Sequence, residues 1–281
     1  MRLIFAASFL IIFFLFEAVL FYPPFIYIFA ALTGVFFVFG FLKIKKKFGF
    51  DRRIFIWLAA GFLYLLTSSF FLMFMNEARL RHVLILLSAF LIAFWAKRFR
   101  LYLYNAIGFS KIDFSLFRII SLATFYFGVA GIYGAAVFLN VHSLALFGLF
   151  LLLAFVCTML FWESAVFAKT ETATGAVDTL SVPKTALSAV EILEKSVMAE
   201  QSSVGKFIWL FVSILCSEMA VAVYFLPLPI FSLAAIVFLF WGFLVWIFYD
   251  FYFKAFNFKK YRVKLIASLV FVGLILLLSA W

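Results

Sequence analysis

The chain has 281 residues, of which 69% are hydrophobic and only 12% charged. Soluble domains are about 45–50% apolar, so one water-soluble core could not bury this much apolar surface. The formal charge of +11 does not indicate nucleic-acid binding, because the basic residues stand between apolar runs and form no basic face. The composition predicts an integral membrane protein that is surrounded by membrane lipids, with no soluble domain and no nucleic-acid partner.

Hydropathy divides the chain into runs that predict transmembrane helices. A helix needs about 20 apolar residues to cross a hydrocarbon core of about 30 Å, and nine runs approach this length: residues 3–22, 25–42, 54–75, 83–96, 119–139, 143–162, 207–226, 230–249 and 265–281. The fourth run reaches only about 21 Å at 1.5 Å per residue. To cross, its helix has to extend into the polar residues before it and begin near Glu77; the alternative is a re-entrant segment. The expected fold class is an all-α bundle of about nine transmembrane helices in a single domain, residues 1–281.

The positions of Lys and Arg predict the orientation of these helices. With nine spans, 21 of the 23 basic residues fall on one side, and only Arg79 and Arg81 fall on the other. Lys and Arg in short loops stay in the cytoplasm, so the N-terminus is expected inside and the C-terminus outside. Without the fourth span, the basic loop after it would share a side with uncharged turns. The split therefore favours a fourth helix that crosses, in a multi-pass protein of the cytoplasmic membrane.

Two longer segments are predicted on the cytoplasmic side. Residues 97–118 alternate aromatic and basic side chains, which is typical of an interfacial segment at the level of the lipid headgroups. Residues 163–206 begin with a Thr/Ala/Gly stretch, which predicts a linker, and continue with apolar residues three and four positions apart. This pattern predicts an amphipathic helix over residues 183–204. That helix either packs on the protein's own inner surface and the headgroups or docks a partner protein.

Two carboxyl groups lie inside predicted spans. Glu17 lies about 7 Å outward of the middle of the first span, and Glu218 within about 2 Å of the middle of the seventh. A charge at such depth costs on the order of 2.5–3.5 kcal/mol on insertion scales, so both side chains are expected to face the bundle interior. With Ser213 and Ser217, they form a candidate intramembrane polar path for protons, cations or a substrate. The alternative is that each carboxyl is protonated and hydrogen-bonds a neighbouring helix.

A second polar group lies on the predicted outer side and is called the outer cluster. On a helix that begins near Glu77, this residue and Arg81 are i,i+4 partners. The arginines could hold an anion or a lipid headgroup; the alternative is that they snorkel and cap the interface. Two residues of another outer turn join the group if the helices are adjacent. The outer cluster comprises Glu77, Arg79, Arg81, His82, Asn140 and His142.

Small residues in the fifth predicted helix indicate close packing. Glycine and alanine let helix backbones approach one another in a membrane. The sequence therefore predicts a packing face, in the centre of the bundle or at a subunit contact. Its residues are Gly128, Ala130, Gly131, Gly134, Ala135 and Ala136.

Motifs for enzyme chemistry are missing. The four Asp residues lie more than 60 positions apart, which removes the paired carboxylates that hold Mg²⁺ in pyrophosphate-using transferases. Metalloprotease, nucleophile-elbow and P-loop signatures are also absent. Cys157 and Cys216 lie in separate apolar runs without a nearby His and are expected to pack as small hydrophobic residues. The sequence thus predicts no catalytic residue, metal or cofactor, and enzyme activity stays open.

Three functions fit these features. The favoured hypothesis is a transport or permeation component whose polar path involves Glu17 and Glu218. The second is a membrane enzyme or flippase-like protein that acts on a lipid of the outer leaflet through the outer cluster. The third is a non-catalytic assembly or scaffold subunit whose amphipathic inner helix contacts a partner.

Overall fold

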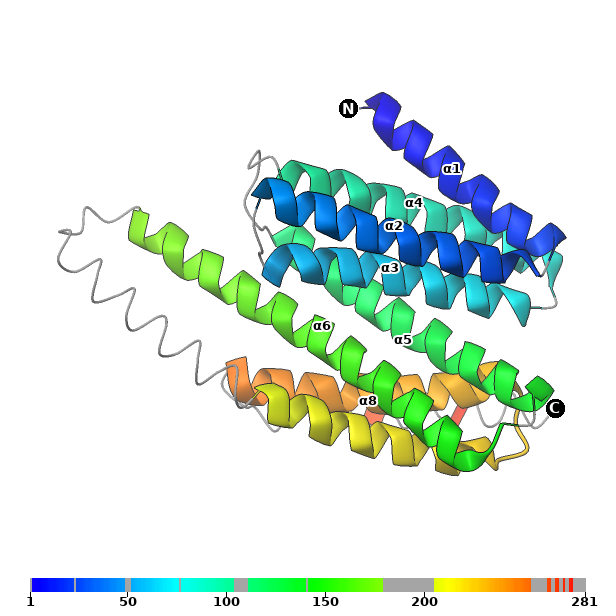
Figure 1. The fold of residues 1–281 in the computed structure, drawn as a ribbon. Coiled ribbons are helices and arrows are strands. Elements are labelled where there is room, and N and C mark those ends of the chain that lie inside the picture. Colours follow the sequence, from blue (N-terminus) through cyan, green and yellow to red (C-terminus); the bar gives the residue numbers. More distant parts are fainter. Residues whose placement is uncertain are drawn as a thin grey trace. The chain divides into compact units, whose positions relative to one another are not determined.

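The long secondary-structure elements of the described chain are all α-helices (Figure 1). The computed structural model describes residues 2–22, 24–48, 52–75, 77–103, 111–139, 141–178 and 205–253, with isolated positions between 262 and 274. Seven labelled helices are α1 (Arg2–Phe21), α2 (Phe25–Phe48), α3 (Arg52–Met73), α4 (Ala78–Leu103), α5 (Lys111–Leu139), α6 (Ser143–Asp178) and α8 (Ile230–Phe253). A further helix, Gly205–Tyr224, precedes α8. The all-α class expected from the sequence is confirmed.

Seven described helices are long and apolar enough to cross a membrane. They are α2, α3, α4, α5, α6, the helix Gly205–Tyr224 and α8. In α1 the apolar stretch that qualifies is shorter, Phe9–Val19. Most of the ninth predicted span lies outside the described residues. The chain is therefore a multi-pass membrane protein, whereas the count of nine and the orientation stay predictions.

Large apolar side chains are exposed along the described helices. On α2, Tyr27 is 78% exposed and Phe39 67% exposed, and Phe14 of α1 is 65% exposed. In water, such contiguous apolar surface would indicate aggregation or a binding face. In a bilayer it is the surface that meets acyl chains. The abundance of Phe, 46 residues in all, is thus explained partly by contact with lipid and partly by ring packing inside the protein.

The fourth helix is longer than the apolar run, residues 83–96, that predicted it. α4 has 26 residues and begins at Ala78, which confirms the expected start near Glu77. At 1.5 Å per residue it is about 39 Å long, enough to span the hydrocarbon core. Its first turn takes in Arg79 and Arg81, whose aliphatic stems can lie along apolar surface while their charges stay near water. Arg100 in its last turn suits the negative end of the helix dipole.

Helices extend into the two longer segments predicted on the cytoplasmic side. Within residues 97–118, α4 continues to Leu103 and α5 begins at Lys111. In the segment predicted as a linker, α6 continues to Asp178, so its first part is helical. One glycine and no proline occur in that stretch, so nothing in it stops a helix. The amphipathic helix predicted over residues 183–204 lies outside the described residues.

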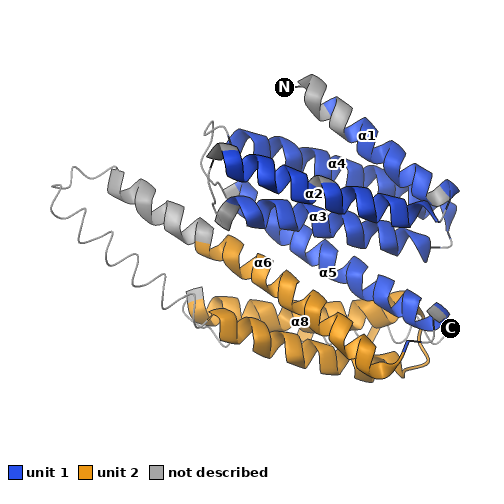
Figure 2. Cartoon of the chain, in the orientation of Figure 1, with its two compact units in different colours: residues 1–141 blue, residues 142–281 orange. Residues whose placement is uncertain are grey.

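The chain divides into two compact units, residues 1–141 and 142–281 (Figure 2). In unit 1, α3 packs against α5, α2 and α4, and α1 lies along α4. In unit 2, α6 contacts α8, and Trp241 donates its indole N–H to the Thr158 hydroxyl at 2.9 Å. Trp209 of the helix Gly205–Tyr224 packs edge-on against Phe155 of α6. Each unit thus has its own aromatic core.

The small residues of α5 form the packing face that the sequence predicts. A Cβ atom added to Gly131 would lie 2.6 Å from the Phe70 ring, and one added to Gly134 would lie 2.4 Å from the Phe74 ring. Only glycine leaves room for these rings. The face lies inside unit 1, where α5 packs on α3 and the turn that follows it.

Candidate functional site

The structure brings together one residue of the predicted polar path and one of the outer cluster. Nδ1 of His82, on α4, lies 2.9 Å from Oε1 of Glu17, on α1. The Glu17 side chain is 14% exposed and the His82 side chain 58% exposed. The pair is therefore open on the imidazole side and sheltered on the carboxyl side. If the ring is protonated the contact is an ion pair, and if it is neutral a hydrogen bond whose donor depends on the tautomer.

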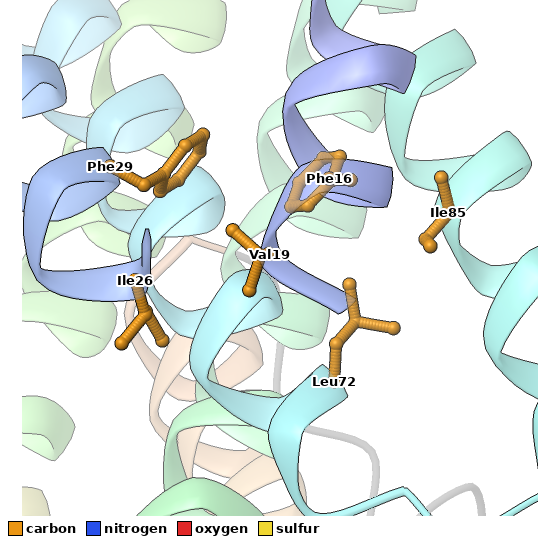
Figure 3. Packing of buried hydrophobic residues seen from close by; sticks show 6 residues of the cluster. All are labelled: Phe16, Val19, Ile26, Phe29, Leu72 and Ile85. Carbon is orange, nitrogen blue, oxygen red and sulfur yellow. The ribbon is translucent and has the colours of Figure 1, made fainter. Parts of the chain in front are cut away.

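A hydrophobic cluster holds α1 and α4 at the spacing that this contact needs. The cluster takes buried side chains from the first four helices: Phe16, Val19, Ile26, Phe29, Leu72 and Ile85 (Figure 3). Phe16 precedes Glu17 directly, and Ile85 follows His82 by three positions, almost one helical turn. Since buried side chains in a close-packed cluster cannot shift independently, the cluster fixes the polar pair beside it.

The rest of the outer cluster is arranged along the first turns of α4. The backbone N–H of Arg81 donates to the Glu77 carbonyl at 3.0 Å, which is the first helical bond here. The side chains of Glu77 and Arg79 are exposed, and no ion pair joins Glu77 to Arg81 among the described residues. The Nε atom of Arg81 is buried without a described hydrogen-bond partner. Glu77 and Arg81 are thus linked by this backbone hydrogen bond, and the described ion pair of the outer cluster is the one between His82 and Glu17.

Of the two outer-turn residues, the structure describes only His142, and the contact it shows for this residue is local. Asn140 lies outside the described residues. His142 begins unit 2, and its Nδ1 accepts the backbone N–H of Leu144 at 3.2 Å. A side chain that accepts an N–H in the first turn of a helix acts as a cap, so His142 has a local role at the start of α6.

The described structure does not bury Glu218 together with the serines of its own helix. Its side chain is exposed, whereas Ser213 and Ser217 on the same helix are fully buried. Ser217 donates to the Ser213 carbonyl at 2.7 Å, and Ser213 donates to the carbonyl of Trp209. The two hydroxyls bond their own helix and do not reach Glu218. Adjacent residues of a helix point about 100° apart, so burial of Ser217 turns Glu218 onto the neighbouring face.

An ion pair that the sequence did not predict joins α4 to α5. Nε and Nη2 of Arg98 donate to the two carboxylate oxygens of Asp113 at 2.6 and 2.5 Å. The side chains are 15% and 2% exposed. Beside it, Trp95 donates its N–H to the Trp57 carbonyl at 3.2 Å, and both rings pack on Phe117. A bidentate buried pair next to packed rings indicates a structural clamp between helices.

Other buried polar groups were also missed. The Tyr64 hydroxyl of α3 donates to the Ser88 hydroxyl of α4 at 3.0 Å. In unit 2, Glu163 of α6 and Asp250 of α8 are 5% and 4% exposed. Nearby stretches of these helices are in contact, since the rings of Trp162 and Tyr252 lie 5.2 Å apart. In the sequence, the only hint that Glu163 and Asp250 are buried was their position directly after the predicted spans 143–162 and 230–249.

The described residues offer no evident metal centre. No group of three or more His, Cys, Asp or Glu side chains gathers among them. Cys157 and Cys216 are free thiols buried in unit 2, as expected for cysteines that pack as small hydrophobic residues. Comparison of the chain with protein-family models, with curated proteins and with solved structures finds no match, so function has to be argued from the residues themselves.

Proposed function

We propose that the protein is a transport or permeation component of the cytoplasmic membrane, with nine spans, in which the Glu17–His82 pair takes up and releases protons. The observation that supports this proposal is the 2.9 Å contact between the two side chains. A carboxyl and an imidazole are the groups that proton relays in pumps and transporters use within the membrane. Glu218 is not part of this proposal, because its side chain is exposed and the hydroxyls of Ser213 and Ser217 bond their own helix instead.

The position of the pair supports uptake from one side. On the predicted topology, the N-terminal end of α4 faces outward, and His82 lies in the second turn from that end. Its exposed ring can exchange protons with water, while the sheltered Glu17 carboxyl receives them. Histidine is the side chain whose ordinary titration range is nearest to neutral pH. Arg81 adds a positive charge beside the pair. When the imidazole is also charged, the two positive charges disfavour the binding of a further cation there.

Proton flux into liposomes tests the proposal. The purified protein is reconstituted into vesicles that contain a pH-sensitive dye. The vesicles are then challenged with a membrane potential alone, and with gradients of Na⁺, K⁺ or Ca²⁺. We expect at least one gradient to drive protons across wild-type vesicles, and Glu17→Gln to abolish this flux because an amide cannot carry the proton. His82→Gln should reduce it strongly.

A matched histidine variant serves as the control. His142→Gln changes the other histidine, which caps α6, and should leave the flux at the wild-type rate. Wild-type vesicles that move no more protons than protein-free vesicles under every gradient would contradict the proposal. So would a Glu17→Gln protein that retains full flux.

A further inference from the structure

The helix Gly205–Tyr224 carries an exposed apolar stripe that contains one acidic residue. The opposite face of this helix is buried in unit 2 and includes Val212, Cys216 and Ala220. Leu210 and Leu226 are also exposed, and the row of exposed positions called here the Glu218 stripe is Phe207, Phe211, Ile214, Glu218, Ala222 and Phe225. No hydrogen bond or ion pair to Glu218 is present among the described residues.

Lipid alone is a poor environment for this carboxyl group. Glu218 lies about 5 Å from the middle of its helix, which leaves it about 10 Å from the edge of a 30 Å hydrocarbon core. This distance exceeds the length of a glutamate side chain, so the carboxyl cannot snorkel to the headgroups. Polar groups at such depth are found paired with other polar groups. The stripe therefore needs a partner that brings a hydrogen-bonding group to the same depth.

The spacing of the stripe indicates what shape that partner has. Successive residues from Phe207 to Phe225 lie four, three, four, four and three positions apart. Spacings of three and four are those of a seam between two helices that cross at a small angle, in membranes as in coiled coils. A single polar residue in such a seam specifies the register of the pair. Ala222, one turn beyond Glu218, lets the backbones approach.

We propose that the Glu218 stripe is the interface of a homodimer, in which Glu218 of one copy hydrogen-bonds Glu218 of the second. All copies insert with the same orientation, so two such helices pack in parallel around a two-fold axis and each residue meets its own counterpart at the same depth. A hydrogen bond between two carboxyl groups requires a proton on one of them, whose O–H then donates to an oxygen of the other. The stripe is thus complementary to itself.

Cysteine cross-linking in native membranes tests the interface. Cys157 and Cys216 are first replaced by Ala, and single cysteines are then introduced for oxidation. Phe211→Cys and Ile214→Cys should each give a disulfide-linked dimer. Leu152→Cys is the matched control, because Leu152 is 63% exposed near the middle of the apolar part of α6, Ser143–Val166, but lies outside the stripe. It should remain monomeric.

Substitutions of Glu218 in the Ile214→Cys background test the carboxyl pair. Glu218→Gln keeps hydrogen bonding and should preserve the dimer, whereas Glu218→Leu should weaken association roughly three- to thirtyfold, the effect of losing one interhelical polar contact. Glu218→Lys alone should give no dimer, because two ammonium groups repel. The Glu218→Lys protein is then co-expressed with a protein of different length that keeps Glu218. A mixed dimer of the two should form.

Three results would overturn the proposal. One is the absence of a dimer for both Phe211→Cys and Ile214→Cys. Another is equally efficient cross-linking at Leu152, which would indicate random collision. The third is a cross-link from the stripe to a different protein. None of these results bears on proton flux, so this inference and the proposed transport function stand or fall separately.

Discussion

The two ends of α4 are each held by a contact between a basic and an acidic side chain, and the contacts differ in burial and geometry. At the C-terminal end, Arg98 donates two hydrogen bonds to Asp113, and both side chains are largely buried. At the N-terminal end, His82 makes one contact with Glu17 and its ring is more than half exposed. The first arrangement stabilises one geometry, whereas the second leaves a titratable group open to exchange.

The difference follows from the groups themselves. A guanidinium keeps its charge at any physiological pH and matches a carboxylate with two parallel bonds, so the Arg98–Asp113 pair has a single state. An imidazole changes its charge near neutral pH and has two distinct nitrogens, so the Glu17–His82 pair has several. We therefore expect substitutions at the C-terminal end to change stability, and substitutions at the N-terminal end to change function.

The largest effect is expected from Asp113→Ala. This change leaves Arg98 in a mostly buried position without its carboxylate, and breaking such a pair costs about 3–5 kcal/mol of unfolding free energy. The measurement is reversible unfolding in mixed micelles as the fraction of denaturing detergent is raised. The matched control is the double variant Arg98→Met/Asp113→Leu, which replaces both charges with apolar groups of similar size. It should recover most of the loss, and a double variant as unstable as Asp113→Ala would contradict this account.

A smaller effect is expected from Gly61→Val, which tests the ring packing beside the ion pair. A Cβ atom at Gly61 would lie 2.8 Å from Nε1 of Trp95. Trp95 cannot move aside, because its ring packs on Trp57 at 4.3 Å and on Phe117 at 4.5 Å. Overpacking of this kind costs roughly 1–3 kcal/mol, measured by the same unfolding assay.

A glycine in the same unit provides the control for that experiment. Gly40 of α2 has nothing within 4 Å of an added Cβ atom, so Gly40→Val should leave stability almost unchanged. Equal losses for Gly61→Val and Gly40→Val would mean that valine itself, and not contact with Trp95, causes the effect. In that case the C-terminal end of α4 would be less tightly held than the ion pair suggests.

The helices themselves were largely predictable from the sequence. Hydropathy places apolar runs of bilayer length, and the positions of Lys and Arg led to a start of α4 near Glu77, where the structure begins it. The glycines of α5 were recognised as a packing face because only small residues allow close approach. Helix continuation into polar sequence was underestimated at α6, since hydropathy marks where a helix enters water and not where it ends.

Contacts between helices were not predictable in the same way. Glu17 and His82 are 65 positions apart, and nothing in the sequence says that α1 lies along α4. Arg98 and Asp113 were assigned to an interfacial segment, which concealed their pairing. For Glu218, the neighbouring serines suggested a polar interior face. Their hydroxyls bond their own backbone instead, and a sequence does not reveal which partner a serine chooses.

The smallest effect on stability is expected from His82→Gln, and this is the sharpest test of the comparison. Glutamine can still donate a hydrogen bond to the Glu17 carboxyl, and interhelical hydrogen bonds in membranes are worth only about 0.6 kcal/mol on average. The apolar cluster of Phe16, Val19, Leu72 and Ile85 continues to hold α1 against its neighbours. We therefore expect an unfolding free energy within about 1 kcal/mol of the wild type.

The same variant should nevertheless lose most of the proton flux, because an amide cannot exchange protons with water. Unfolding and flux are measured on one preparation, so that a change in function is not confused with a loss of folded protein. The two ends of α4 then separate clearly: Asp113→Ala lowers stability strongly, and His82→Gln lowers flux with little change in stability. If His82→Gln destabilises the protein as much as Asp113→Ala does, the Glu17–His82 contact is a second structural clamp. The proton-handling role proposed for it would then have no support.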